Sequence, residues 1–248
     1  ESVSIGGRPQ RFTHEGRSLV IEVSPPVKLG QHADVRIAYS VDYPLANGTG
    51  LTWTPGRENA TSPTDRVPQI HSQGQPGYNH TWFACHDFPN ERLTTELVVT
   101  VEDGFIVGSN GRLVNTRYAG SEGGKPRTRW HWLQDRPHSA YLVSMIVGKS
   151  SIVGLPWPEG LKKAVTSSGN ALCVSMYAPV GTERTAARAY ANPPARVAYF
   201  AERFDEPYPW DKYSQALVRE FAAGGMENTS ATTMQAGSAR AGPGSQDG

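Results

Sequence analysis

The sequence predicts a mainly β fold: an antiparallel sandwich or saddle, followed by the beginning of an α+β domain. The 248 residues include 26 glycines and 19 prolines, and the apolar runs are short, as is typical of strands joined by turns. Apolar and polar residues alternate in several segments before residue 147. Beyond residue 179 the apolar spacing becomes helical. These observations together favour two successive regions.

Alternation and β-branched content predict the strands of the first region. They lie at residues 19–23, 35–41, 96–102, 105–107, 129–132 and 141–147. Asp103-Gly104 and Asn110-Gly111 are dipeptides that favour tight turns between strands. Residues 43–81 are rich in Pro, Gly, Asn, Thr and Gln, which predicts a long connection, and such connections are uncommon unless functional.

The second region begins near Pro179. Asn192 and Pro193 suit the cap and first position of a helix, and Pro207 stops it. The apolar residues at helical spacing are Val197, Phe200, Ala201 and Phe204. A strand at Ser214–Phe221 follows. We therefore expect an amino-terminal β domain over residues 1–177 that is incomplete at its start, a second domain beginning over 178–234, and a disordered small-residue tail over 235–248.

Composition argues against several classes of function. The 24 basic residues nearly cancel the 23 acidic residues, so no strong field favours a nucleic acid or an anionic membrane. No apolar run approaches the roughly 20 residues that span a bilayer, which predicts no membrane span. Cys85 and Cys173 could form a disulfide, but two buried thiols are favoured.

One short segment carries the strongest functional signal, Gly224-Gly225-Met226-Glu227-Asn228. Glycine lets the backbone approach a ligand and expose its N–H and C=O groups. A glutamate beside such a backbone can hold a cation, and the free α-amino group of a peptide is one. The competing interpretation is a strand that ends in a Gly-Gly turn with a solvated glutamate.

Two further segments support a functional interpretation. They are Glu202–Tyr213, with its Pro-Tyr-Pro-Trp-Asp-Lys-Tyr run, and Trp82–Thr94. Taken in their order along the chain, the three segments resemble the aminopeptidase N family of zinc metallopeptidases, although Ala84 replaces the proline usual in the Trp82–Thr94 segment. The resemblance implies a thermolysin-like α+β catalytic domain after the β domain, and zinc in the full-length enzyme. It also implies peptide substrates that bind through their free N-terminus.

The resemblance also implies roles for individual residues. Glu227 would grip the substrate's N-terminal amine, and Gln73 would reach across from the β domain to the same amine, with Gln75 as a competing assignment. Gly224 and Gly225 would offer backbone hydrogen bonds, and Met226 would line the first side-chain pocket. Asp87 and Arg92 are expected to form a structural turn and ion pair. His86 and His131 are expected not to be metal ligands, and the large aromatics are expected in the core: Trp82, Phe83, Trp130 and Trp132.

The sequence contains no H-E-x-x-H zinc motif. His14-Glu15 comes nearest, but Ser18 stands where the second histidine is required. We therefore expect no catalytic residue and no zinc in this chain, which would be the amino-terminal portion of an aminopeptidase, inactive alone. The alternative is a non-catalytic β module that binds peptides or a partner. Either way, an exposed apolar face would favour self-association or pairing with the missing part of the chain.

Overall fold

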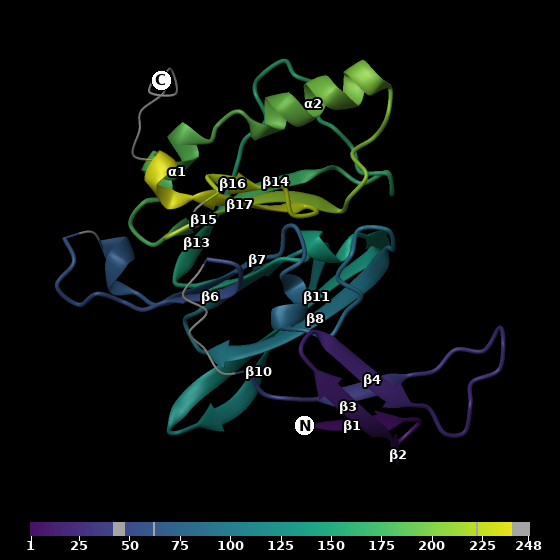
Figure 1. Cartoon of the computed structure of the whole chain (residues 1–248). Helices are drawn as coiled ribbons and strands as arrows, with labels where there is room; N and C mark the ends of the chain where they lie inside the picture. The colour runs from purple at the N-terminus through teal and green to yellow at the C-terminus, as the bar shows by residue number, and fades with distance from the viewer. Residues whose placement is uncertain (42–47, 62, 222, 240–248) are drawn as a thin grey trace.

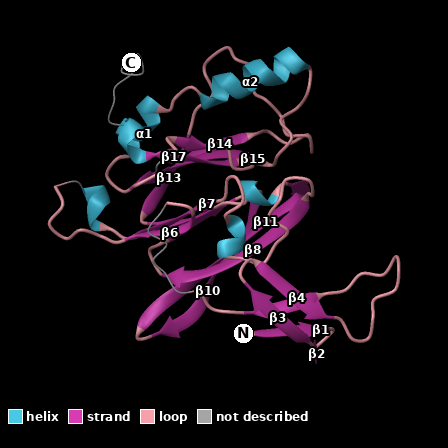
Figure 2. Ribbon diagram, viewed as in Figure 1, coloured by secondary structure: helices cyan, strands magenta, loops and turns pink. Residues whose placement is uncertain are grey.

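The computed structural model describes residues 1–41, 48–61, 63–221 and 223–239. Strands dominate these residues (Figure 2), which confirms the predicted mainly β class. Five short strands open the chain: β1 (Ser2–Ile5), β2 (Arg8–Pro9), β3 (Arg11–Glu15), β4 (Ser18–Glu22) and β5 (Val35–Ala38). They form a three-stranded sheet in the order β2-β1-β5 and a separate β3-β4 hairpin, both antiparallel.

Two larger antiparallel sheets form the middle of the molecule. One has the order β10-β11-β8 and the other β6-β7-β12-β9. Their strands are β6 (Gly50–Thr54), β7 (Gln69–Gln73), β8 (Leu93–Glu102), β9 (Ile106–Ser109), β10 (Arg112–Glu122), β11 (Lys125–His138) and β12 (Met145–Gly148). Short 3-10 helices interrupt the connections: η1 (Pro63–Arg66), η2 (Asn79–Thr81) and η3 (Ala140–Leu142).

A five-stranded sheet with two helices completes the fold. Its order is β13-β14-β15-β17-β16, and β14-β15 and β15-β17 are parallel pairs. The elements are β13 (Ser150–Gly154), β14 (Cys173–Pro179), α1 (Glu183–Ala189), α2 (Pro193–Phe204), β15 (Lys212–Val218), β16 (Gly225–Met226), β17 (Ala231–Gln235) and η4 (Ala236–Ala239). None of the helices described is long and apolar enough to cross a membrane.

The alternation of side chains along β15 separates two cores. Ala216 and Val218 point into the main core, which they share with Val107, Trp130 and Trp132 of the β sheets. Leu217, between them, points the other way and packs with Ala186 of α1. Figure 1 shows the resulting layers, with α1 and α2 over one side of the five-stranded sheet and β6, β7 and β11 towards the other.

Several predictions about local structure are confirmed. Helix α2 begins at Pro193 with Asn192 as its cap residue, and it ends before Pro207. The turn at Asn110-Gly111 joins β9 to β10. Trp82, Trp130 and Trp132 are buried in the core, and Phe83 packs partly buried against it.

Other predictions are wrong. Residues 43–81 are not one long connection, because β6 and β7 lie within them; residues 43–47 and 62 lie outside the described part. Of the predicted strand 141–147, only residues 145–147 belong to a strand, β12, because Val143 N donates to Ala140 O and closes the 3-10 turn η3 over Tyr141 and Leu142. The cysteines are free thiols as expected, but Cys173 is exposed and Cys85 only half-buried.

Candidate substrate-binding site

The segment 219–230 connects β15 to β17 and carries the predicted amine-binding glutamate. Gly224 has φ +70°, a left-handed conformation that side chains disfavour, and its carbonyl accepts from Gln235 N at 2.8 Å. The chain then forms β16, which pairs antiparallel with β17 at the end of the five-stranded sheet. Gly224 and Gly225 therefore lie in a turn at the edge of the sheet.

The residues on either side of β16's end differ in exposure. Met226 is 1% exposed and packs in the main core with Val218 and Phe221. Glu227, the next residue, is exposed. The buried methionine fixes the backbone at this point, and the glutamate is presented at the surface beside the edge strand.

Buried polar contacts hold the residues that follow Glu227. The Asn228 side chain donates to Leu142 O at 3.4 Å and accepts from Thr233 Oγ1 at 3.0 Å. Ser230 has φ +59°, and its carbonyl accepts from Lys212 Nζ at 2.9 Å and from Ser214 N at 3.0 Å. These contacts hold Ser230 in a conformation that costs free energy in isolation.

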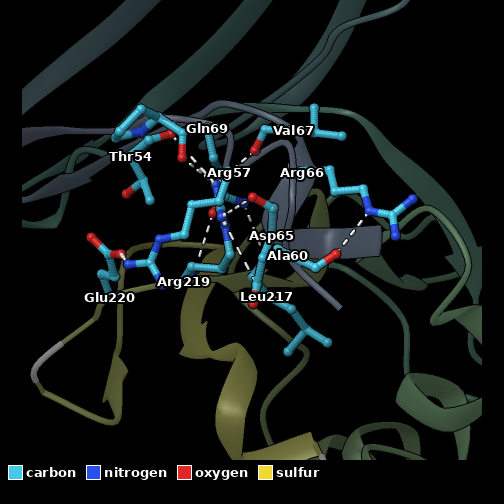
Figure 3. Close-up of polar contacts among 11 residues, drawn as sticks. Thr54, Arg57, Ala60, Asp65, Arg66, Val67, Gln69, Leu217, Arg219 and Glu220 are labelled. Carbon is cyan, nitrogen blue, oxygen red and sulfur yellow. Dashed lines mark hydrogen bonds and ion pairs between the residues drawn. The ribbon is translucent and has the colours of Figure 1, made fainter. Parts of the chain in front are cut away.

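An arginine anchors the other end of the segment. Arg219 is 8% exposed, and its guanidinium donates to Asp65 O at 2.9 Å and to Val67 O at 2.6 Å. The Gln69 side chain joins the same cluster: it accepts from Arg219 N at 3.0 Å and donates to Leu217 O at 3.2 Å. Figure 3 shows these groups converging between β7 and the end of β15, with the exposed Arg57–Glu220 pair beside them. The buried Arg219 guanidinium thus links the end of β15 to the backbone of residues 65–67, just before β7.

His71 lies in the core close to this anchor. It is fully buried, and its ring meets that of Phe221 edge-on at a centroid distance of 5.6 Å. Burial, with the nearby Arg219 cation as a smaller cause, lowers the pKa of His71 to about 4. His71 is therefore neutral at pH 7, and its ring packs in the core against Phe221.

Gln73 is the last residue of strand β7. Its side chain is 8% exposed, and its Oε1 accepts from Gln75 N at 3.4 Å. Gln75, the competing assignment, is exposed in the turn that follows. Gly74 lies between them in close contact with its surroundings, because a Cβ there would lie 2.6 Å from Tyr141 O.

Residues 140–145 contact the sequence neighbours of both candidate residues. On one side Asn79 donates to Ala140 O at 2.6 Å, and Met145 N donates to Ser72 Oγ at 2.9 Å, next to Gln73. On the other side Asn228, next to Glu227, donates to Leu142 O. The fold therefore brings the ends of two segments, about 150 positions apart in sequence, to one shared support.

The predicted ion pair between Asp87 and Arg92 is replaced by another contact. Asp87 does not take Arg92 as its partner but binds His80, whose backbone N and Nδ1 lie 2.9 and 2.8 Å from Oδ2. Local geometry within the turn favours the nearer group. His86 and His131 contact Asn90 and Glu96 rather than a cluster of ligands. Within the described ranges, no group of three or more His, Cys, Asp or Glu residues could hold a metal.

Comparison with known proteins gives consistent results. No family model matches the chain. It is 22% identical to mouse aminopeptidase B over 222 residues, which cover 88% of this chain and 29% of that protein. It is 30% identical to rice aminopeptidase M1-D over 146 residues, covering 59% of this chain and 15% of that protein. It is also 29% identical over 142 residues to chicken transcription initiation factor TFIID subunit 2, covering 54% and 12%.

Solved structures share the fold. Legionella pneumophila aminopeptidase A, in complex with aspartic acid, superposes with a TM-score of 0.72 at 15% identity, over 94% of this chain and 25% of that one. A two-domain M1 zinc metallopeptidase bound to L-tryptophan superposes with a TM-score of 0.71 at 19% identity, over 95% and 50%.

These similarities support assignment to the aminopeptidase N family of zinc metallopeptidases, at low sequence identity. The chain spans less than a third of the curated family members it matches. The activity, substrates and partners of a whole family member are therefore proposals for this chain.

The sequence alone did not reveal the supports of the segment. Asn110 indicated only a turn, Arg219 lay in the predicted strand 214–221, and Gln69 lay in the predicted long connection 43–81. A charged residue directly after the apolar end of β15 is the one signal that could have pointed to Arg219, since such residues are rarely buried without partners.

Proposed function

We propose that the chain is the amino-terminal portion of a zinc-dependent aminopeptidase that removes N-terminal residues from peptides. In this proposal Glu227 binds the free α-amino group of the substrate, and Gln73 contributes from the β domain. The observation that carries it is the exposed Glu227 on a firmly anchored edge segment that shares its support with the Gln73 strand.

The chemistry follows from charge and geometry. An ammonium held about 3 Å from a carboxylate, away from bulk water, attracts it more strongly than it would in water. The side-chain oxygen of Gln73 can accept a further hydrogen bond from the ammonium group. Fixing the amine in this way selects the first peptide bond for reaction, because it fixes how far each peptide bond of the substrate lies from the amine-binding residues.

The backbone around Glu227 supplies the remaining contacts of the proposal. β16 is an edge strand paired only with β17 in its sheet, so an extended peptide can add alongside Gly224 and Gly225. Met226 directs its side chain into the core. Because Met226 is 1% exposed, it would support the first side-chain pocket from below rather than line it.

The described residues do not fit a zinc site. They hold no suitable cluster, and the sequence has no H-E-x-x-H motif. We propose that this chain binds no zinc and is inactive alone, and that the ligands and the general base of the enzyme are supplied by other residues. The division into a β domain over 1–177 and a catalytic-domain start over 178–234 is part of the same proposal.

The second candidate function is a non-catalytic module that binds peptides or a partner. The similarity to a TFIID subunit, a protein not named as a peptidase, favours it. Self-association, or pairing with further chain, would use the exposed surface of α2 in either case.

Zinc content and hydrolysis separate the two functions. We would measure zinc and hydrolysis of aminoacyl anilides for the 248-residue chain and for the protein at its natural length. We expect about one zinc per chain and chelator-sensitive activity in the natural-length protein, and neither in the 248-residue chain. Zinc-dependent activity in the 248-residue chain would contradict its inactivity, and a natural-length protein without zinc or activity would favour the binding module.

A further inference from the structure

Asn110 is a buried asparagine whose side chain reaches into the candidate site from the β domain. It is 2% exposed. Its Nδ2 donates to Thr229 O at 2.7 Å and to Leu142 O at 2.9 Å, and its Oδ1 accepts from Ser144 N at 2.7 Å. Both amide donors and the amide acceptor are therefore used.

These three contacts join the two halves of the proposed amine site. Thr229 lies two residues after Glu227. Ser144 precedes Met145, whose backbone N–H is bound by Ser72, the neighbour of Gln73. One side chain thus connects the backbone behind Glu227 to residues 144–145, which in turn contact the Ser72 side chain beside Gln73.

The turn that carries Asn110 is itself held firmly. Gly111 has φ +70°, and a Cβ there would lie 2.0 Å from Leu133 O, so the backbone passes too close for any other residue. Its N–H donates to Ser230 Oγ at 2.8 Å. Asn110 therefore projects from a rigid position, which a positioning residue requires.

We propose that Asn110 is a positioning residue that sets the separation of Glu227 and Gln73, and through it the recognition of the substrate's α-amine. This inference rests on the proposed function. Asn110 does not touch the amine; it acts through Thr229, Leu142 and Ser144. A small displacement of either candidate residue would weaken a site in which both must meet one ammonium group.

Two substitutions test this role. Asn110→Asp preserves the shape but replaces the donors with an oxygen that faces two carbonyl groups. Asn110→Ser retains a hydroxyl near Ser144 N but lacks the amide that reaches Thr229. The matched control is Asn115→Asp, an exposed position on the neighbouring strand β10.

The first measurement is amide hydrogen exchange in the 248-residue chain. Both Asn110 variants should exchange roughly tenfold faster at residues 226–231 and 141–145, the scale of one lost hydrogen bond, with α2 and the Asn115→Asp control unchanged. Unchanged exchange at 226–231, or equal acceleration throughout α2, would overturn the proposal. If neither variant folds, rapid exchange of the wild-type Asn110 side-chain amide protons would overturn it, and slow exchange would support it.

The second measurement is inhibition of the natural-length protein by a free-amine dipeptide and by its N-acetylated form. The Asn110→Ser variant should raise the inhibition constant of the free-amine dipeptide roughly tenfold and leave that of the acetylated form unchanged. Equal changes in both constants would overturn the positioning role. If the wild type does not distinguish the two inhibitors, the proposed function itself has failed, and the exchange data still decide whether Asn110 couples the two segments.

Discussion

The two sides of the five-stranded sheet are stabilised in different ways. The inner side, towards β6, β7 and β11, combines a buried apolar core with anchors such as Arg219 and Asn110 that join regions distant in sequence. On the outer side, α2 buries Ala198 but leaves Phe200 53% and Phe204 69% exposed. The inner side therefore fixes the position of Glu227, while the outer helix contributes surface that another molecule could cover.

The largest effect is expected at Arg219. Replacing Arg219 by alanine removes a buried cation from Asp65 O and Val67 O, and should reduce the free energy of unfolding by about 3 kcal/mol. The matched control is Arg57→Ala, which breaks an exposed ion pair with Glu220 and should cost less than about 1 kcal/mol. Urea unfolding of both variants measures the difference. Equal losses of unfolding free energy would show that the buried Arg219 contacts stabilise the fold no more than the exposed Arg57–Glu220 ion pair does.

A smaller effect on the same side depends on pH. The folded-state pKa of His71 is lowered to about 4 from an ordinary 6.5, so the unfolded state binds more protons between these values. Stability should fall as the pH drops through this window, by about 2 kcal/mol at pH 5 from this group. Burial lowers the pKa of His138 to about 4 as well, which adds in the same direction.

Unfolding measurements at pH 7 and pH 5 test the histidine. The His71→Gln variant should lose part of the pH dependence, and His32→Gln, at an exposed position, should retain all of it. If His71→Gln keeps the full wild-type slope, the acid sensitivity arises elsewhere.

The smallest effect is expected on the outer side. Phe200→Ser should change the free energy of unfolding by less than about 0.5 kcal/mol, because the side chain is already largely exposed. Leu217 is 2% exposed and packs beneath the helices, so Leu217→Ala should reduce the free energy of unfolding by about 3 kcal/mol. Thermal unfolding compares them, and a large loss from Phe200→Ser would mean that this surface is covered in solution.

The sequence predicted what depends on local pattern. Alternation located β4, β8 and the centre of β11, and the Asn-Pro cap located the start of α2. The same helical periodicity marked Phe200 and Phe204 as apolar-face residues, but it could not tell that they stay exposed, since burial depends on what packs against the helix.

Tertiary contacts account for most of what the sequence could not supply. Strands β6 and β7 lie among prolines and polar residues, and the pairing of β7 with both β6 and β12 favours strand over local propensity. The segment carrying Glu227 was identifiable from its residues, but its anchors come from positions up to 154 residues away. No local pattern encodes such a contact.

The most direct test of the central claim compares a free-amine peptide with its N-acetylated counterpart in the natural-length protein and its Glu227→Gln variant. The account predicts that kcat/KM for the free-amine peptide falls roughly 30-fold or more, the scale of a lost charge partner, while the acetylated peptide and the unfolding free energy hardly change. Gln73→Ala should give a milder loss of the same kind. Equal losses on both peptides, or intact cleavage of the free-amine peptide, would contradict the assignment of Glu227 as the amine-binding residue.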